Sequence, residues 1–167
     1  MKKYIVFICF TLICFLVNAQ VAIGKPNVSN NSTLLDFGTD NKGIVLPTVS
    51  TNPSDAVAGT FIVNSTSQSI NMLEGSTWKN LTLNGGFSAN PFLNTGADVG
   101  NGVIIGANIS SKPGVLVLES STRALILPYV ANPHTTIGNN ASIGTIVYDT
   151  TSDSLALFDG VNWHYWQ

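Results

Sequence analysis

The chain contains the same stretch of sequence twice, and this repetition constrains its fold more than any other feature. Residues 59–81 align with residues 144–166 at a spacing of 85 residues. Seven of the aligned positions are identical. Two shorter blocks upstream match in the same order, VAIG (21–24) with VIIG (103–106) and GIVLPTV (43–49) with ALILPYV (124–130). We interpret this pattern as a duplicated module whose loops have changed length.

Each copy is predicted to form three short strands joined by turns. In the second copy, two apolar runs and one aromatic run are separated by turn residues, and the first copy repeats this order. The runs are 146–149, 155–158 and 162–166. No amphipathic helix is predicted, although single helical turns stay open at 50–58 and 131–143. We therefore expect an all-β fold made of two tandem copies of a short-strand β-meander module.

Six repeated positions are expected to hold the scaffold. Gly75 and Gly160 follow an acidic residue in a tight turn, where a positive φ favours glycine. The two prolines cannot donate a ladder hydrogen bond and should end or edge a strand. Each tryptophan is expected to fill the core of its own module. The six positions are Pro47, Pro128, Gly75, Gly160, Trp78 and Trp163.

The first 19 residues are predicted to be a secretory signal peptide. Lys2 and Lys3 precede an apolar run from Tyr4 to Val17, and Ala19 ends a small-residue cleavage site. The run is too short to serve as a membrane-spanning anchor. We expect no membrane span after cleavage, copy A over 20–82, a Gly/Asn-rich linker over 83–102, and copy B over 103–167.

The composition of the exported part excludes several classes of partner. Both cysteines of the chain, Cys9 and Cys14, leave with the signal peptide, so no disulfide is expected. Lys2 and Lys3 leave as well, so five of the seven basic residues remain against nine acidic ones. This balance offers no basic patch for nucleic acid.

The apolar residues suggest association between chains. A module of about 60 residues buries too little apolar surface to be stable alone without staples. The runs 115–118 and 124–127 do not alternate, which predicts burial on both faces. Few charges are present to protect strand edges. We expect a homo-oligomer, and the alternative is a single compact β domain built from both halves.

The block order resembles a known group of modules. The stretches 103–106, 125–128, 144–151 and 155–163 carry the resemblance, as VIIG, LILP, GTIVYDTT and LALFDGVNW. They are similar to β-repeat modules of secreted and surface proteins of Bacteroidota, and to β modules of phage tail fibres. The resemblance implies an extracellular fibre or surface role, often trimeric in the phage cases. It carries over no catalytic residue.

No catalytic motif is present, and we expect the protein not to be an enzyme. His134 and His164 are predicted to be surface residues. Asp149 and Asp153 are predicted to organise a turn rather than to bind calcium. No metal site and no cofactor are expected.

The C-terminal aromatic residues are the candidate ligand or interface residues. These are Trp163, Tyr165 and Trp166, and strand alternation places the first two on the face opposite Trp166. An exposed aromatic side chain can stack on a sugar or contact another chain. Thr150 and Ser154 follow aspartates and are candidate O-glycosylation sites.

The sequence therefore predicts an exported structural or adhesive protein at the cell surface, with the periplasm as the alternative location. We expect it to act through oligomerisation, with a trimer favoured, and through contacts with a surface glycan or another surface protein. The alternative function is a carbohydrate-binding module that uses the C-terminal aromatic residues.

Overall fold

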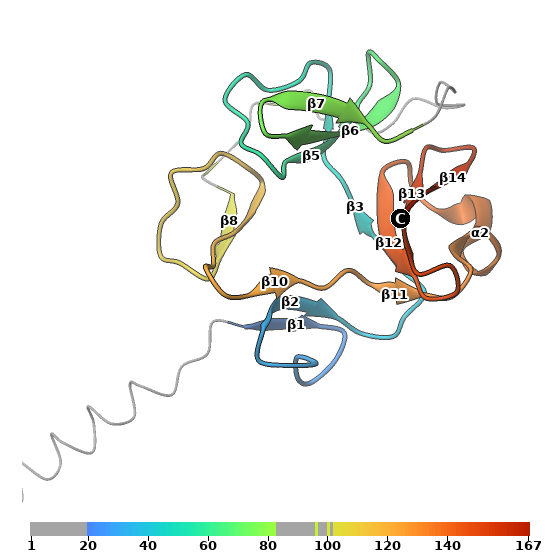
Figure 1. Cartoon of the computed structure of the whole chain (residues 1–167), viewed down its shortest axis with the longest axis horizontal. Coiled ribbons are helices and arrows are strands. Elements are labelled where there is room, and N and C mark those ends of the chain that lie inside the picture. Colours follow the sequence, from blue (N-terminus) through green and yellow to red (C-terminus); the bar gives the residue numbers. More distant parts are fainter. Residues whose placement is uncertain (1–19, 83–95, 97–99, 101) are drawn as a thin grey trace, which may run out of the picture.

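The computed structural model describes residues 20–82, 96, 100 and 102–167. The predicted signal peptide over 1–19 and most of the predicted linker over 83–102 lie outside these described residues. The described part is mostly β, as the sequence predicts, and its strands form four small sheets arranged around the molecule (Figure 1). The chain alternates between these sheets.

Seven strands lie in each half of the described chain. The N-terminal half, 20–82, has β1 (Val21–Ile23), β2 (Thr33–Phe37), β3 (Ile44–Val45), β4 (Thr48–Val49), β5 (Phe61–Asn64), β6 (Ser69–Glu74) and β7 (Thr77–Asn80). The C-terminal half, 102–167, has β8 (Val103–Ile105), β9 (Leu116–Leu118), β10 (Ala124–Leu125), β11 (Tyr129–Val130), β12 (Thr145–Asp149), β13 (Ser154–Phe158) and β14 (Trp163–Trp166).

Apart from β3 and β10, strands at the same place in the two halves pair in the same way. The antiparallel meander β5-β6-β7 corresponds to β12-β13-β14. A short parallel strand precedes each meander and lies at its edge, β4 on β5 and β11 on β12. The N–H of Val63 donates to the Pro47 carbonyl at 2.9 Å, and the N–H of Tyr148 donates to Pro128 at the same distance. Each proline thus interrupts a strand, as predicted from its missing N–H.

The last turn of each meander contains a glycine in the left-handed region. Gly75 has a φ of 60° between β6 and β7, and Gly160 has a φ of 99° between β13 and β14. The prediction that these turns require a positive φ is confirmed. A residue with a Cβ is strained in this conformation.

Two strand pairs join the halves to each other. Strand β3 of the N-terminal half pairs antiparallel with β12, and β10 of the C-terminal half pairs parallel with β2. The N–H of Leu46 donates to the Gly144 carbonyl at 3.0 Å, and the N–H of Ile126 donates to Leu35 at 3.0 Å. The two halves are therefore interlaced through main-chain hydrogen bonds (Figure 1).

One buried cluster draws its side chains from both meanders. Val63, Ile70 and Leu81 of the N-terminal half lie in it with Ile146 and Leu157 of the C-terminal half. A second, smaller cluster on the other face of the C-terminal meander contains Val130, Val147 and Ala156. Packing between the halves thus adds to the strand exchange.

The prediction that residues 115–118 and 124–127 are buried on both faces is wrong for the single chain. Val117 is buried, whereas Val115, Leu116 and Leu125 are exposed. The physical reason is that β9 pairs only with β8 among the described residues, so one edge and part of its apolar surface stay uncovered.

Among the described residues, helix occurs in the segment between β11 and β12. It contains α2 (Pro133–Thr136) and the 3-10 turn η2 (Gly138–Asn140), within the 131–143 segment where a helical turn was open. The corresponding segment 50–58 has no helix. Within the described residues, no helix has the length and apolar character needed to cross a membrane.

Gly43 allows the close approach of β3 to β12. A Cβ at this position would lie 2.4 Å from Thr145 Cγ2 and 2.9 Å from the Ile146 carbonyl oxygen. We expect Gly43→Ala to lower the free energy of unfolding by about 1–3 kcal/mol, because the backbone must move. Urea unfolding followed by tryptophan fluorescence measures this change.

Gly114→Ala is the matched control for this substitution. Its Cβ would lie 3.3 Å from a Val117 methyl group, which can adjust, and its φ is ordinary. We expect a change of about 0.5 kcal/mol or less. Equal effects of the two substitutions would contradict the role assigned to Gly43.

Candidate interaction site

A row of large side chains crosses one face of the C-terminal sheet. Tyr129, Tyr148, Leu155 and Trp166 are successive register partners on β11, β12, β13 and β14, so they point to the same side. The rings of Tyr129 and Tyr148 have centroids 5.2 Å apart. Tyr129 and Trp166 are exposed, and the other two are half-buried. We call these four residues the aromatic row.

Hydrogen bonds hold two members of the aromatic row, Trp166 at one end and Tyr148 inside it. The Nε1–H of Trp166 donates to the Leu81 carbonyl at 2.7 Å, which ties β14 to the end of the N-terminal meander. The Tyr148 hydroxyl donates to Asp153 at 3.3 Å. Partial burial and the Asp153 carboxylate raise the pKa of Tyr148, so its hydroxyl stays protonated at neutral pH. The row is therefore a preorganised surface.

Trp163 and Tyr165 point to the opposite face of this sheet, as alternation predicts. Trp163 packs on Phe158, with ring centroids 5.2 Å apart, and on the smaller buried cluster. Its Nε1–H donates to Gly138 at 3.3 Å. Tyr165 is exposed, and its hydroxyl lies 3.0 Å from Nδ1 of His134 on α2. The three predicted aromatic residues therefore do not form one site, and Trp163 is mainly a core residue.

Trp78 occupies a different environment from Trp163. It lies on β7 and lines an open groove with Asn52, Pro53 and Leu73. The corresponding space in the C-terminal half lies next to α2 and η2, where Trp163 contacts Gly138. The repeated tryptophans thus share a strand position but differ in their surroundings.

A buried contact between His164 and Asp159 lies beside the last turn. The His164 Nε2 atom lies 2.6 Å from Asp159 Oδ2, and both side chains are largely shielded from solvent. The prediction that His164 is a surface residue is therefore wrong. Backbone N–H groups of Val161 and Asn162 also donate to Asp159, at 2.8 and 2.6 Å.

The environment of Asp159 favours its ionised form. Burial opposes ionisation, but the hydrogen bonds from the Asn162 N–H, from His164 and from the Val161 N–H outweigh it and hold the pKa below its usual value. The donors Val161 and Asn162 lie in the β13–β14 turn, and His164 lies at the start of β14. This arrangement fixes the turn geometry, since a buried carboxylate needs such donors.

Asp149 organises the loop between β12 and β13. It is buried and accepts the N–H groups of Asn132 and Thr151, both at 2.9 Å, and the Ser152 hydroxyl at 2.7 Å. Asn64 has the same place in the N-terminal half and accepts two backbone N–H groups. In the described part of the chain, no three His, Cys, Asp or Glu side chains gather as metal ligands.

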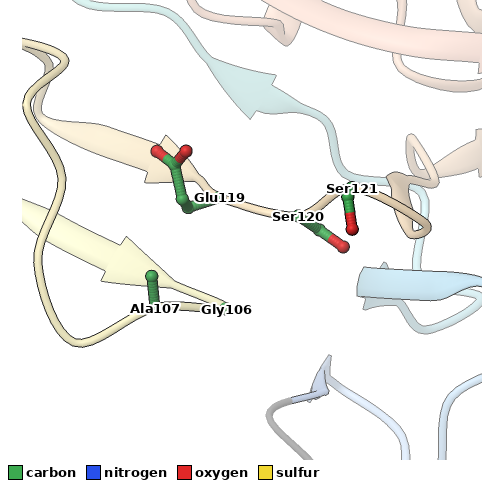
Figure 2. Close-up of a pocket in the computed structure, with 5 residues that line it drawn as sticks. All are labelled: Gly106, Ala107, Glu119, Ser120 and Ser121. Atoms are coloured by element: carbon green, nitrogen blue, oxygen red, sulfur yellow. The ribbon is translucent and has the colours of Figure 1, made fainter.

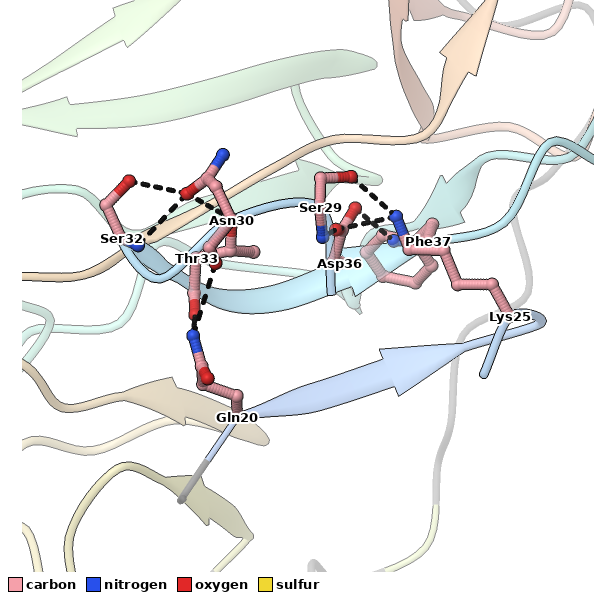
Figure 3. A network of polar contacts seen from close by, with 8 residues as sticks. All are labelled: Gln20, Lys25, Ser29, Asn30, Ser32, Thr33, Asp36 and Phe37. Atoms are coloured by element: carbon pink, nitrogen blue, oxygen red, sulfur yellow. Dashed lines mark hydrogen bonds and ion pairs between the residues drawn. The ribbon is translucent and has the colours of Figure 1, made fainter. Parts of the chain in front are cut away.

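A third buried carboxylate, on Asp36, holds the loop between β1 and β2. Lys25 Nζ lies 2.6 Å from Asp36, and the Ser29 N–H donates to the same carboxylate at 2.6 Å (Figure 3). Burial opposes ionisation, but Lys25 and Ser29 hold the Asp36 pKa below its usual value. In a separate group of contacts at the same loop, the Gln20 side-chain amide donates to the Thr33 carbonyl at 2.8 Å (Figure 3). Asp36 is thus a structural group.

The open depression beside β9 offers little catalytic chemistry. It is lined by Gly106, Ala107, Glu119, Ser120 and Ser121 (Figure 2). Its one carboxylate, on Glu119, pairs with Lys112 and accepts the Ser110 hydroxyl. These hydrogen bonds, from Lys112 first, lower the Glu119 pKa. The Ser120 hydroxyl oxygen accepts the N–H groups of Thr122 and Arg123, at 3.2 and 3.0 Å, and so organises the following turn.

The two candidate O-glycosylation residues differ in access. Thr150 is exposed at the start of the β12–β13 turn. Ser154 is 2% exposed, and its hydroxyl lies 2.6 Å from that of Ser152. The folded chain therefore presents Thr150 but not Ser154 to a modifying enzyme.

Sequence reasoning missed Tyr129 and Tyr148 as members of one surface. They lie 19 positions apart and meet only because β11 pairs parallel with β12 across a long connection. The repeated Leu-Pro step before Tyr129 was the only local signal of that strand. The register that joins both tyrosines to Trp166 depends on the whole sheet.

Comparison of this chain with protein-family models, with curated proteins and with solved structures gives no match.

The Asp159 turn gives a testable effect on stability. We expect Asp159→Asn to lower the free energy of unfolding at pH 7 by about 1.5–3 kcal/mol, since hydrogen bonds to a charged group are lost or weakened. The folded-state pKa lies below the unfolded value of about 3.9, so this stabilisation exists above that pH and disappears as the pH falls through the folded-state pKa.

Urea unfolding from pH 7 to pH 2.5 measures this contribution. The difference between wild type and Asp159→Asn should shrink as the pH falls. Asp153→Asn is the control, because Asp153 is exposed and its φ of 50° suits asparagine equally. A constant difference over the whole pH range would contradict the role of the ionised carboxylate.

Proposed function

We propose that this chain is an exported structural or adhesive protein that acts through association of β modules at the cell surface. In this proposal the signal peptide over residues 1–19 directs export. The two halves are tandem copies of one module, joined by the Gly/Asn-rich linker. The similarity to secreted Bacteroidota modules and tail-fibre β modules belongs to this proposal too.

Matched hydrogen bonds in the two halves support the duplication. The pair of serine hydroxyls at Ser67 and Ser69 has a counterpart at Ser152 and Ser154. The Gly59 N–H donates to Leu73, and the Gly144 N–H donates to Phe158. Both contacts keep the spacing of 85 residues found in the sequence. One contact is made by side chains and the other by main-chain atoms, and their repetition at the same spacing supports a common ancestor module.

The observation that carries the associative function is exposed apolar surface on short strands. Val45, Leu116, Leu125 and Tyr129 are exposed on β3, β9, β10 and β11. Only 10% of the residues in the chain are charged, so little protects these strands from pairing with other chains. A surface of this kind suits assembly better than it suits a free monomer.

Export and association can be tested on the native protein. We expect intact producing cells to lose the protein on treatment with external protease. The purified protein should begin at Gln20 and should have a solution mass, by light scattering, of at least two chains. Its intact mass also reports whether Thr150 carries a glycan. A protein that resists external protease and stays monomeric at all concentrations contradicts the proposal.

Carbohydrate binding is the second candidate function. The observation that favours it is the aromatic row. Two exposed rings, Tyr129 on β11 and Trp166 on β14, lie on one face of the sheet. Tyr148 lies on β12, between these two strands. Aromatic rings stack on the apolar faces of sugars, and their polar atoms reach the hydroxyl groups.

A glycan array with point variants tests this second function. We expect a carbohydrate-binding row to lose signal at least about tenfold in Tyr129→Ala and in Trp166→Ala, equivalent to about 1.4 kcal/mol. Tyr165→Ala is the matched control, because Tyr165 is 39% exposed against 41% for Trp166 but lies on the opposite face. Equal losses in all three variants, or no glycan signal for the wild type, would exclude this function.

A further inference from the structure

The contact between the two halves is asymmetric. The N-terminal half contributes the β2 edge, which receives β10, and the β3 strand, which inserts beside β12. The C-terminal half does not make the corresponding contacts with the N-terminal half. A contact that uses different surfaces on two equivalent units is called heterologous. It leaves each unit with one surface that has no partner, which we call its unsatisfied surface.

Strand β9 carries the first unsatisfied surface. In the N-terminal half, β2 is covered by β10, and Leu35 is 1% exposed. Leu116 occupies the corresponding place on β9, since both residues pair with the first residue of the preceding strand. Leu116 is 42% exposed, and no third strand covers β9 among the described residues. Strand β9 is the equivalent of β2, and β3 is the equivalent of β10. The strand that would cover β9 is therefore a β3 from another chain.

Strand β5 carries the matching unsatisfied edge. On β12, the edge residues Thr145 and Ile146 pair with β3, and Tyr148 and Asp149 pair with β11. On β5, the edge at Val63 and Asn64 pairs with β4. Within the described residues, no strand pairs with this edge beside Phe61. Strand β5 is the equivalent of β12, and β10 is the equivalent of β3. The strand that would pair with this edge of β5 is therefore a β10 from another chain.

The sheet faces show the same asymmetry. In the N-terminal meander, the row Val63, Ile70 and Leu81 is buried against the C-terminal half. The corresponding residues of the C-terminal meander are Tyr148, Leu155 and Trp166 of the aromatic row, and these are only partly covered. The other half of the chain therefore covers this row of side chains in the N-terminal meander. The equivalent row in the C-terminal meander stays partly uncovered.

Gly59 provides room for such a cover. Within the chain, the Cβ position of Gly144 lies 2.4 Å from Val63, so this glycine accommodates the neighbouring row. Gly59 corresponds to Gly144, and the space around its Cβ position is open to 4 Å. Tyr148 corresponds to Val63. A second chain could therefore place its Gly59 against Tyr148.

We propose that a second copy of this chain binds head to tail, so that its N-terminal half contacts the C-terminal half of the first as the two halves contact each other within one chain. Strand β3 of the second copy pairs with β9 of the first, and β10 of the first pairs with β5 of the second beside Phe61. The aromatic row of the first copy packs against Phe61 and Met72 of the second.

This inference rests on the proposed associative function and names the partner and the edges. The N-half surface is defined as Val45, Phe61 and Met72, and the C-half surface as Leu116, Leu125 and the aromatic row. Ala124 stands where the intrachain contact has Gly43, so β10 should sit slightly farther from β5 than β3 does from β12. The aromatic row is then an interface between chains, and glycan binding there would compete with assembly.

Two lysine substitutions separate the two surfaces. Val45→Lys alters the N-half surface and Leu116→Lys the C-half surface; both side chains are exposed in the single chain, so folding should be retained. Lysine on a strand edge opposes pairing. Val161→Lys is the control, because Val161 is also exposed but lies in the β13–β14 turn outside both surfaces.

Light scattering after size exclusion gives the decisive result. We expect the wild type and Val161→Lys to form assemblies of two or more chains, and each of the other variants alone to be monomeric. A mixture of Val45→Lys and Leu116→Lys should form a dimer and nothing larger, because one intact pair of surfaces remains. Circular dichroism checks that each variant is folded.

The other outcomes are also decisive. Assemblies of wild-type size in both single variants would show that the chain associates by other surfaces, which overturns this inference and leaves the proposed function standing. Monomeric variants that stay monomeric on mixing would indicate a symmetric contact and would also overturn it. A monomeric wild type at every concentration would overturn both the inference and the associative function.

Discussion

The exchange of two short strands between the halves is the constraint on which the rest of the structure depends. Strands β3 and β10 have only two residues each, and neither lies in a sheet made by its own half alone. Their main-chain hydrogen bonds bring the two meanders together, and the cluster around Ile70 and Leu157 then excludes water. Apolar burial of this kind is the dominant favourable contribution to the folding free energy of a globular chain.

The strand exchange also explains why the buried carboxylates are used to fix loops. Asp36, Asp149 and Asp159 are buried, each accepts backbone N–H groups, and Asp36 also pairs with Lys25. Each carboxylate fixes one loop, so that the short strands on either side meet their partners in register. With strands this short, loop geometry has to supply the precision that longer ladders supply in other β proteins.

Local patterns were enough to predict the β class, the three strands of each meander and the glycines of their last turns. These features depend on residues near one another, such as Asp159 and Gly160, and on the positive φ that the turn requires. The burial of residues 115–118 was predicted wrongly, because an apolar run shows that a surface needs a cover and does not show whether the same chain supplies it. The exposed Leu116 and the buried Leu35 illustrate this difference.

The candidate site was only partly predictable. Alternation placed Trp163 and Trp166 on opposite faces, but the aromatic row requires the parallel pairing of Tyr129 with Tyr148 across a long connection. His164 also escaped prediction, because its buried partner Asp159 lies in the preceding turn and looked like an ordinary turn residue. Both cases depend on contacts that only the assembled sheet creates.

The central claim is that the halves form one cooperative unit through the exchanged strands. Native-state hydrogen exchange tests it most directly, by comparing the amides of Leu46 and Ile126, which bridge the halves, with the amide of Val63, which bonds within one half. The account predicts the same opening free energy for all three, equal to that of global unfolding. Exchange of Leu46 and Ile126 at a clearly lower free energy than Val63 would mean that the halves fold separately and only dock, which would contradict it.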